Sequence, residues 1–353
     1  MKLASRLSEI VPSATLALTA KARALQQQGV DVVGFGAGAP DFDTPAPIKQ
    51  AAIQALEAGF TKYTPTAGIP ELREEICRKL REENALEYDP AQVLVSCGAK
   101  HSLFNFFQAA LDPGDEVLIP SPFWVSYPEM VRLAGGRPVF VPSEEKEGFR
   151  LLADAVRPLI TPRTKVLIVN SPSNPTGCGL ERMELEALAA LAVERDLFVV
   201  SDEIYEPLTY DGFRHVSIAS LGAEIKKRTL VVNGFSKSYA MTGWRLGYAA
   251  GEKPLIAAMT TVQDHSTSNA TSFAQKGAVA ALLSPKETLR SWVLEFAARK
   301  DHIAALLRRI PGVGLPEPQG AFYAFANFSA YFGRSAGGKL IDGSTALSDY
   351  LLS

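Results

Sequence analysis

Cysteine and histidine are scarce in this chain of 353 residues. The three cysteines, Cys77, Cys97 and Cys178, are an odd number without metal-site spacing, and the four histidines are scattered. This pattern argues against a disulfide framework and against a zinc site. Reduced thiols in a cytoplasmic protein are the favoured interpretation.

An excess of one charge and long apolar runs are also missing. The 36 basic and 38 acidic side chains leave a net charge of −2, which does not suggest a nucleic-acid or anionic-membrane partner. No signal segment opens the chain, and no apolar run approaches the ~20 residues of a membrane span. The hydrophobic content of 47% predicts a large core, and the length predicts one large and one smaller domain.

Short apolar runs alternate with helical patterns between Val93 and Gly251. The runs are Val93–Ser96, Glu116–Pro120, Pro138–Val141, Lys165–Asn170, Leu197–Ser201, Thr229–Asn233 and Leu246–Ala250. Most are nearly continuous rather than alternating, which is typical of strands buried on both faces of a mostly parallel sheet. The pattern predicts an α/β fold with a seven-stranded sheet flanked by helices, such as one over Met183–Arg195.

Polar residues follow several of these runs, at the carboxyl ends where open α/β sheets bind ligands. Gly98, Ala99 and Lys100 lie between a strand and a helical pattern, and free N–H groups at such a turn suit a phosphate. Asn174 lies in a proline-rich loop that would direct it at a ligand oxygen. Taken alone, both segments are equally typical of ordinary turns, and that interpretation is favoured for each.

Two further strand ends carry charge. Asp202 directly follows a buried strand, where a carboxylate needs a cationic partner such as a pyridinium nitrogen, although a helix N-cap is an alternative. Lys237 follows another strand, with Arg245 eight residues on. A lone lysine is usually a surface group, but this spacing lets Lys237 reach an aldehyde while Arg245 binds a phosphate. With Tyr205 as a phenol-oxygen ligand, few cofactors other than pyridoxal 5′-phosphate need this set.

The residues Gly234-Phe235-Ser236-Lys237 and Thr242-Gly243-Trp244-Arg245-Leu246-Gly247 look like a pyridoxal-phosphate attachment signature. With other matching segments, the chain resembles class I/II aminotransferases of pyridoxal-phosphate fold type I, particularly the bacterial aspartate aminotransferases of subgroup Ib. Those segments are Pro12–Thr15, Gly38–Phe42, Lys62-Tyr63, the Asn174 loop and Ser201–Tyr205. The resemblance implies residues 1–44 as an arm and part of a small domain, 45–284 as the large cofactor domain, and 285–353 as an incomplete remainder of the small domain.

The resemblance also implies roles for the residues around the cofactor. Lys237 forms the internal aldimine, and Asp202 keeps the pyridine nitrogen protonated. The other implied cofactor contacts are Tyr205 and Asn174 at the phenolic oxygen, Trp124 on the ring face, and Gly98, Ala99, Lys100, Ser236 and Arg245 at the phosphate. Tyr63 looks like the residue that reaches a phosphate across a subunit interface, which implies a homodimer with shared sites.

The implied reaction is a ping-pong transamination between an L-amino acid and a 2-oxo acid. Lys100, Ser13 and Thr15 resemble the set that receives the distal carboxylate of aspartate or glutamate, although Lys100 facing the phosphate is an alternative. Gly38, Trp124 and Asn174 complete the implied substrate contacts. Relatives that also accept prephenate have a lysine where this chain has Val11, so the resemblance implies weak prephenate activity.

Two other functions remain open on the same scaffold. A carbon–sulfur β-lyase would share Lys237, Asp202 and Arg245. A non-catalytic pyridoxal-phosphate sensor would need a DNA-binding domain, for which the short segment before the fold leaves no room.

The chain ends at Ser353 in a helical pattern, whereas family members continue to an arginine that binds the substrate α-carboxylate. The resemblance therefore implies that these 353 residues bind the cofactor but transaminate poorly. Either they are part of a longer protein, which the intact cofactor residues favour, or the protein is a degraded member. Arg334, beside Gly333 and Ser335, is expected to be solvated rather than a substitute.

Overall fold

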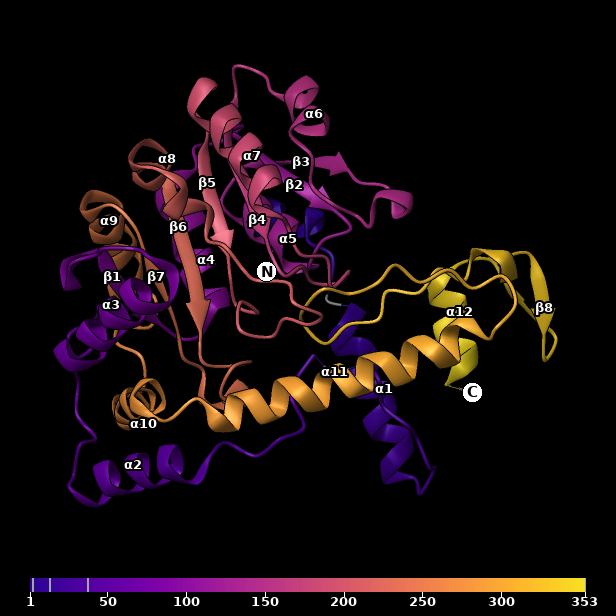
Figure 1. Cartoon of the computed structure of the whole chain (residues 1–353), viewed down its shortest axis with the longest axis horizontal. Helices are drawn as coiled ribbons and strands as arrows, with labels where there is room; N and C mark the ends of the chain where they lie inside the picture. The colour runs from indigo at the N-terminus through magenta and orange to yellow at the C-terminus, as the bar shows by residue number, and fades with distance from the viewer. Residues whose placement is uncertain (2, 13, 37, 353) are drawn as a thin grey trace.

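The computed structural model describes residues 1, 3–12, 14–36 and 38–352, and a seven-stranded sheet lies at the centre of this part of the chain (Figure 1). The strands, in chain order, are β1 (Val93–Ser96), β2 (Glu116–Ser121), β3 (Arg137–Pro142), β4 (Thr164–Asn170), β5 (Phe198–Asp202), β6 (Thr229–Gly234) and β7 (Gly247–Ala250). Their order across the sheet is β1-β7-β6-β5-β4-β2-β3. Strand β7 runs antiparallel to both neighbours, and the other pairs are parallel.

This arrangement confirms the predicted α/β fold and its mostly parallel sheet. Each predicted run matches one strand, with ends that differ by no more than one residue. The helices are α1 (Ala14–Gln27), α2 (Ala46–Glu57), α3 (Pro70–Asn84), α4 (Ala99–Ala110), α5 (Ser126–Leu133), α6 (Ala153–Val156), α7 (Arg182–Glu194), α8 (Ala223–Lys227), α9 (Lys253–Asp264), α10 (Ser272–Leu283), α11 (Glu287–Arg308) and α12 (Ser344–Leu351). Among the described residues, none of these helices combines the length and apolar character of a membrane span.

Helices cover both faces of the sheet, which explains why the strands are apolar without alternation. On β5, Val199 packs in a cluster with Leu188 of α7, and the next residue, Val200, packs with Phe106 of α4 and Met259 of α9. Because successive strand side chains point to opposite faces, both faces require apolar residues. A third cluster joins β1 and β7 to α3 and α10. The apolar pattern of each strand therefore stops where the polar residues at its end begin.

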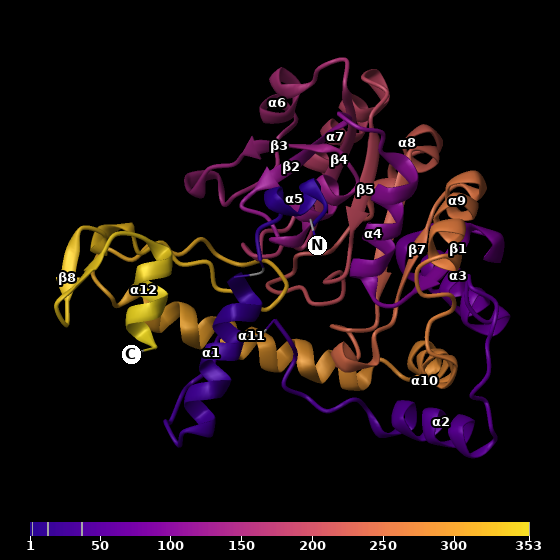
Figure 2. The ribbon, with the colours of Figure 1, turned by 180° about the vertical axis from the view of Figure 1, so that it is seen from behind.

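The C-terminal part of the chain leaves the sheet along α11, which runs below it in Figure 1 toward α12 (Figures 1 and 2). The apolar stripe of α11, including Phe296, packs beneath the strand ends against Phe42 and Phe322. Lys21 of α1 forms a 2.6 Å ion pair with Asp349 of α12, so the two ends of the chain meet. The division into segments 1–44, 45–284 and 285–353 stays a prediction.

A small antiparallel pair, β8 (Arg334–Ala336) and β9 (Lys339–Ile341), lies in the C-terminal part and was not predicted from the sequence. Gly337 and Gly338 connect the strands with positive φ angles of 55° and 76°. Three-residue strands are too short to show an alternating pattern. Arg334 therefore belongs to a strand rather than a loop, and it is exposed, as expected.

Candidate active site

The carboxyl ends of β4 and β5 are tied together by the side chain of Asn170. Asn170 and Asp202 are partners in the parallel register, and the Asn170 amide donates a 2.9 Å hydrogen bond to the Asp202 carbonyl. The Asn170 side-chain oxygen accepts a 2.8 Å hydrogen bond from the backbone of Asn174. One buried amide thus fixes the Asn174 loop relative to the end of β5.

Asp202 is the last residue of β5 and is 4% exposed. Its carboxylate accepts hydrogen bonds from the Tyr127 hydroxyl at 2.6 Å and from the backbone N–H of Ile204 at 3.3 Å. Burial raises the pKa of Asp202 to about 6, and the Tyr127 hydrogen bond opposes that rise. A turn rather than a helix follows, so Asp202 is not a helix N-cap. A buried carboxylate with two neutral donors is well suited to a cationic ligand.

Lys237 lies in the turn after β6, and its ammonium donates a hydrogen bond to the carbonyl of Gly38. Its Nζ is 5.8 Å from the ring centroid of Tyr205 and 5.6 Å from that of Phe322. Burial, followed by the positive charge of Arg245, lowers the pKa of Lys237 to about 8. A larger share of neutral amine is therefore present near neutral pH than for a surface lysine.

Tyr205 is buried just after β5, and its hydroxyl lies 2.5 Å from the hydroxyl of Tyr323. Burial raises the pKa of Tyr205 well above its ordinary value, while a hydrogen bond with the Asn174 side chain acts in the opposite direction. The phenol therefore stays protonated and can donate to a ligand oxygen. Asp202, Lys237, Asn174 and Tyr205 are brought together at one edge of the sheet, as the sequence analysis expected.

The N-terminus of α4 forms a cradle with Arg245. Gly98 has a φ of 92°, and a Cβ atom there would lie 2.5 Å from Nη2 of Arg245. The guanidinium donates to the carbonyls of Thr242, at 2.8 Å, and Cys97, at 3.3 Å. Ala99 begins the helix, and buried Ser236 precedes Lys237 in its turn. Backbone N–H groups, a helix dipole and a guanidinium together suit a phosphate.

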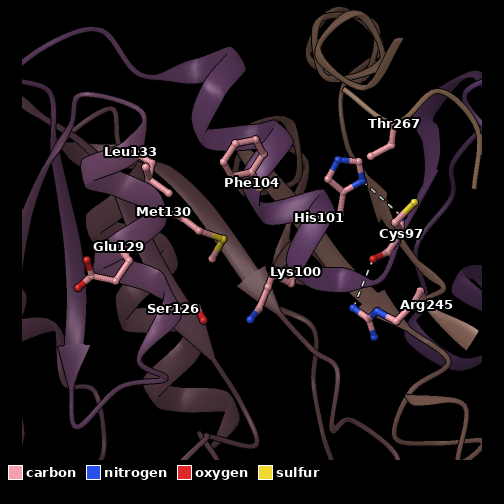
Figure 3. Close-up of a pocket in the computed structure, with 10 residues that line it drawn as sticks. All are labelled: Cys97, Lys100, His101, Phe104, Ser126, Glu129, Met130, Leu133, Arg245 and Thr267. Atoms are coloured by element: carbon pink, nitrogen blue, oxygen red, sulfur yellow. Dashed lines mark hydrogen bonds between the residues drawn. The ribbon is translucent and has the colours of Figure 1, made fainter. Parts of the chain in front are cut away.

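A cavity of about 430 Å³ opens beside this cradle (Figure 3). Lys100 and Arg245 line it together with Glu129 of α5. The Lys100 ammonium lies 4.9 Å from the ring centroid of Trp124, and burial, followed by the charge of Arg245, lowers the pKa of Lys100. Trp124 in turn packs edge-on against Tyr127. Lys100 and Trp124 are thus close to the cradle, as expected for a shared cofactor and substrate region.

Three predicted site residues are either exposed or outside the described part of the chain. Tyr63 is 91% exposed in the single chain. Ser13 lies outside the described residues, and so does the side chain of Thr15. Their predicted contacts stay predictions.

A second polar group contains the buried Glu203 and the partly buried Glu206 and His215, whose ligand atoms all fall within 4.8 Å of one another. Several protein side chains already contact the two glutamates. His215 Nε2 is 3.2 Å from Glu203, which also accepts hydrogen bonds from Ser201 and Ser217. Lys79 and Asn84 donate to Glu206. Lys79 already pairs with Glu206, so the cluster is best described as an ion-pair network, in which Oε2 of Glu203 and both ring nitrogens of His215 form no hydrogen bond among the described residues.

A family model for class I and II aminotransferases matches residues 30–352. The aspartate aminotransferase of Geobacillus stearothermophilus is 52% identical over 93% of this chain and 83% of its own length. The probable aspartate/prephenate aminotransferase of Aquifex aeolicus is 49% identical over 99% of this chain and 88% of its own length.

The chain belongs to the class I and II aminotransferases. Solved structures agree with this assignment. The aspartate aminotransferase of Rhizobium meliloti has a TM-score of 0.95 and 42% identity, covering 100% of this chain and 88% of that one. The Thermus thermophilus enzyme with maleate has a TM-score of 0.89 and 48% identity over 94% of this chain and 86% of that one.

Aminotransferases of this type use pyridoxal 5′-phosphate, and the groups present fit that cofactor. Asp202 supplies a buried carboxylate whose neutral donors leave its charge unpaired. The Gly98–Arg245 cradle has the dipole and donors that a phosphate needs, and Lys237 has a depressed pKa suited to an amine nucleophile.

Three residues of the candidate site were not predicted from the sequence: Asn170, Tyr127 and Tyr323. Asn170 could have been found, because it is a polar residue at the carboxyl end of a predicted central strand. Tyr127 follows Trp124 by three residues, but the eight-residue α5 is too short for a clear pattern. Tyr323 reaches Tyr205 across 118 residues from an irregular segment, and no local signal marks it.

Proposed function

We propose that this protein catalyses pyridoxal-phosphate-dependent transamination between an L-amino acid, aspartate or glutamate, and a 2-oxo acid by a ping-pong mechanism. The observation that carries the proposal is the meeting of a buried carboxylate, Asp202, and a lysine of lowered pKa, Lys237, beside a phosphate cradle. Relatives about 50% identical are named aspartate aminotransferases, which favours transamination over β-lyase chemistry.

The proposed binding roles divide along the site. Asp202 holds the pyridine nitrogen, and Tyr205 with Asn174 holds the phenolic oxygen. The proposed phosphate ligands are the N–H groups of Gly98, Ala99 and Lys100 with Ser236 and Arg245, and Trp124 covers the ring face. When bound, the cofactor supplies an aldehyde for Lys237 and an electron sink for the bond broken at the substrate Cα.

Lys237 is the proposed acid and base. Once the substrate amine had displaced it from the cofactor, its Nζ would be free to take the proton from the substrate Cα and hold it until the proton is returned to the product side. The lowered pKa of about 8 keeps this amine near the range in which one group can both accept and donate a proton. The Gly38 carbonyl, which accepts a hydrogen bond from Nζ, lies on the proposed substrate side.

Substrate choice is proposed to depend on Lys100 with Ser13 and Thr15 as receptors of a distal carboxylate. Lys100 and Arg245 both line the cavity, which supports an acidic substrate, and Glu129 lines it as well. Several relatives are named aspartate/prephenate aminotransferases. Because Val11 stands where such relatives are expected to have lysine, we propose that prephenate is a poor substrate here.

We also propose a cytoplasmic homodimer with shared sites. Tyr63, exposed in the single chain, is the residue proposed to reach the phosphate of the partner subunit. The three cysteines are free thiols, which supports a reducing compartment.

A half-reaction tests the proposal. The holoenzyme is mixed with L-aspartate, and the absorbance of the bound cofactor is followed without any 2-oxo acid present. We expect conversion to pyridoxamine phosphate with release of one equivalent of oxaloacetate, and none in Lys237→Ala. Release of pyruvate and ammonia from cystathionine, with no conversion by aspartate, would instead identify a β-lyase.

A further inference from the structure

Tyr127 makes a direct contact with the predicted pyridine-binding carboxylate. Its hydroxyl lies 2.6 Å from Oδ2 of Asp202, and the tyrosine is 1% exposed in the core beside α4. The family signature that points to Lys237 and Asp202 does not include this residue. Its position on the first turn of α5 places it one helical turn after Trp124.

The contact leaves the Asp202 carboxylate with little freedom. Oδ2 accepts from Tyr127 and Oδ1 accepts from the N–H of Ile204, so both oxygens are held by donors on different elements. The remaining lone pairs are available to a ligand. A short hydrogen bond to an ionised carboxylate also favours the charged form, and both partners are shielded from water.

Tyr127 also links two parts of the site. Its ring packs edge-on against Trp124, with centroids 5.3 Å apart and an interplanar angle of 89°. Its backbone N–H donates to the carbonyl of Trp124 at 3.1 Å. Tyr127 therefore contacts both Trp124, which is proposed to cover the ring face, and Asp202, which is proposed to bind the ring nitrogen.

We propose that Tyr127 is a positioning residue whose hydroxyl fixes the orientation of the Asp202 carboxylate and keeps it ionised. The inference rests on the proposed role of Asp202 toward the cofactor. The groups facing Asp202 are Tyr127 from α5, Glu203 and the Ile204 N–H after β5, and Lys237 from the turn after β6. Tyr205 and Tyr323 face both Asp202 and Tyr127, and burial keeps the pKa of Tyr127 well above its ordinary value, so its hydroxyl remains a donor.

The direction of the pH effect follows from this geometry. Without the hydroxyl, burial acts on Asp202 with one opposing donor fewer, so the pKa of Asp202 rises. The protonated acid cannot pair with a protonated ring nitrogen. As the solution is made more acidic, the variant without the Tyr127 hydroxyl should therefore begin to lose cofactor affinity at a higher pH than the wild-type protein does.

The test is the dissociation constant of pyridoxal 5′-phosphate for wild type and Tyr127→Phe, measured from about pH 4.5 to about pH 7.5, that is, roughly 1.5 units on either side of the Asp202 pKa of about 6. We expect affinity to weaken by about 10- to 100-fold, and its acid limb to move up by about one pH unit. In an Asp202→Asn background the same substitution should have little effect, because its target is gone. Tyr88→Phe is the matched control, since the Tyr88 hydroxyl is buried and bonded to no described residue.

A second variant guards against a folding defect. Replacing Tyr127 with 3-fluorotyrosine keeps the shape and strengthens the donor, so the acid limb should move in the opposite direction. An unchanged acid limb in both variants would overturn the inference, as would an equal loss in the Asp202→Asn background. A wild-type protein that binds no cofactor would instead overturn the proposed function, so the two failures are distinguishable.

Discussion

Replacing Asp202 with asparagine should separate what the site does for function from what it does for stability. In the cofactor-free protein this carboxyl is buried, and burial raises its pKa from 3.8 to about 6. Each pKa unit corresponds to 1.36 kcal/mol, so a shift of roughly two units is equivalent to about 3 kcal/mol. The folded state holds the Asp202 proton more tightly than the unfolded state does. The wild-type apoprotein should therefore lose stability as the pH rises from about 4 to about 6, and keep that deficit at higher pH.

Asparagine removes the titration and still offers an oxygen to the Tyr127 hydroxyl. The Asp202→Asn apoprotein should therefore be more stable than wild type by up to about 3 kcal/mol at pH 8, with the difference shrinking toward pH 4. Urea unfolding at equal protomer concentration measures this difference at each pH. Adding pyridoxal phosphate should reverse the order at pH 8, because ligand binding to the folded wild type adds stability that the variant lacks.

Asp264, exposed at the end of α9, provides the matched control. Its change to asparagine should alter stability by no more than about 0.5 kcal/mol, without the same pH dependence. An Asp202→Asn difference that does not vary with pH would refute the reasoning. So would a wild-type apoprotein that is the more stable of the two at pH 8.

Three further outcomes follow from other parts of the molecule. The rate at which Lys237 reacts with pyridoxal, which lacks the phosphate, should rise with pH through about 8 and then level off. The reason is that burial and Arg245 lower the pKa of this amine. A midpoint of the rate profile near the pKa of free lysine would contradict this prediction. Gly98→Ala should weaken pyridoxal-phosphate binding by about tenfold or more, as measured by fluorescence titration; Gly114→Ala, with a similar φ of 91° and no Cβ contact within 4 Å, should not. Lys79→Met should destabilise the protein by about 3 kcal/mol in urea unfolding, because it leaves Glu206 buried without its cation. Lys49→Met, at a half-exposed lysine, is the control. An equal loss of stability in the two variants would show that the buried pair contributes little.

The fold class and the seven strands of the central sheet could be predicted from the sequence because both faces of the sheet are covered. Strands such as β4 and β6 are continuous apolar runs, and their ends are sharp because polar residues begin where the cover stops. The β8–β9 pair gave no such signal. Its strands are short and mostly exposed, so no pattern of burial marks them.

The candidate site divides in a similar way. Asp202 ends β5, and Lys237 and the Gly98 turn lie just after β6 and β1, so the rule for strand ends finds them. Tyr127 and Tyr323 come from a short helix and an irregular segment, and their contacts join residues 75 and 118 positions apart. Such contacts depend on how α5 and the C-terminal part pack against the sheet, which no local pattern determines.

The central claim is that Lys237 carries pyridoxal phosphate and that aspartate transfers its amino group to this cofactor. Borohydride reduction followed by peptide mass spectrometry tests it directly, before and after addition of L-aspartate. We expect a phosphopyridoxyl group on Lys237 before aspartate, and its loss afterwards, because pyridoxamine phosphate is not attached to the protein. A label on Lys100, no label at all, or a Lys237 label that aspartate leaves unchanged would contradict the account.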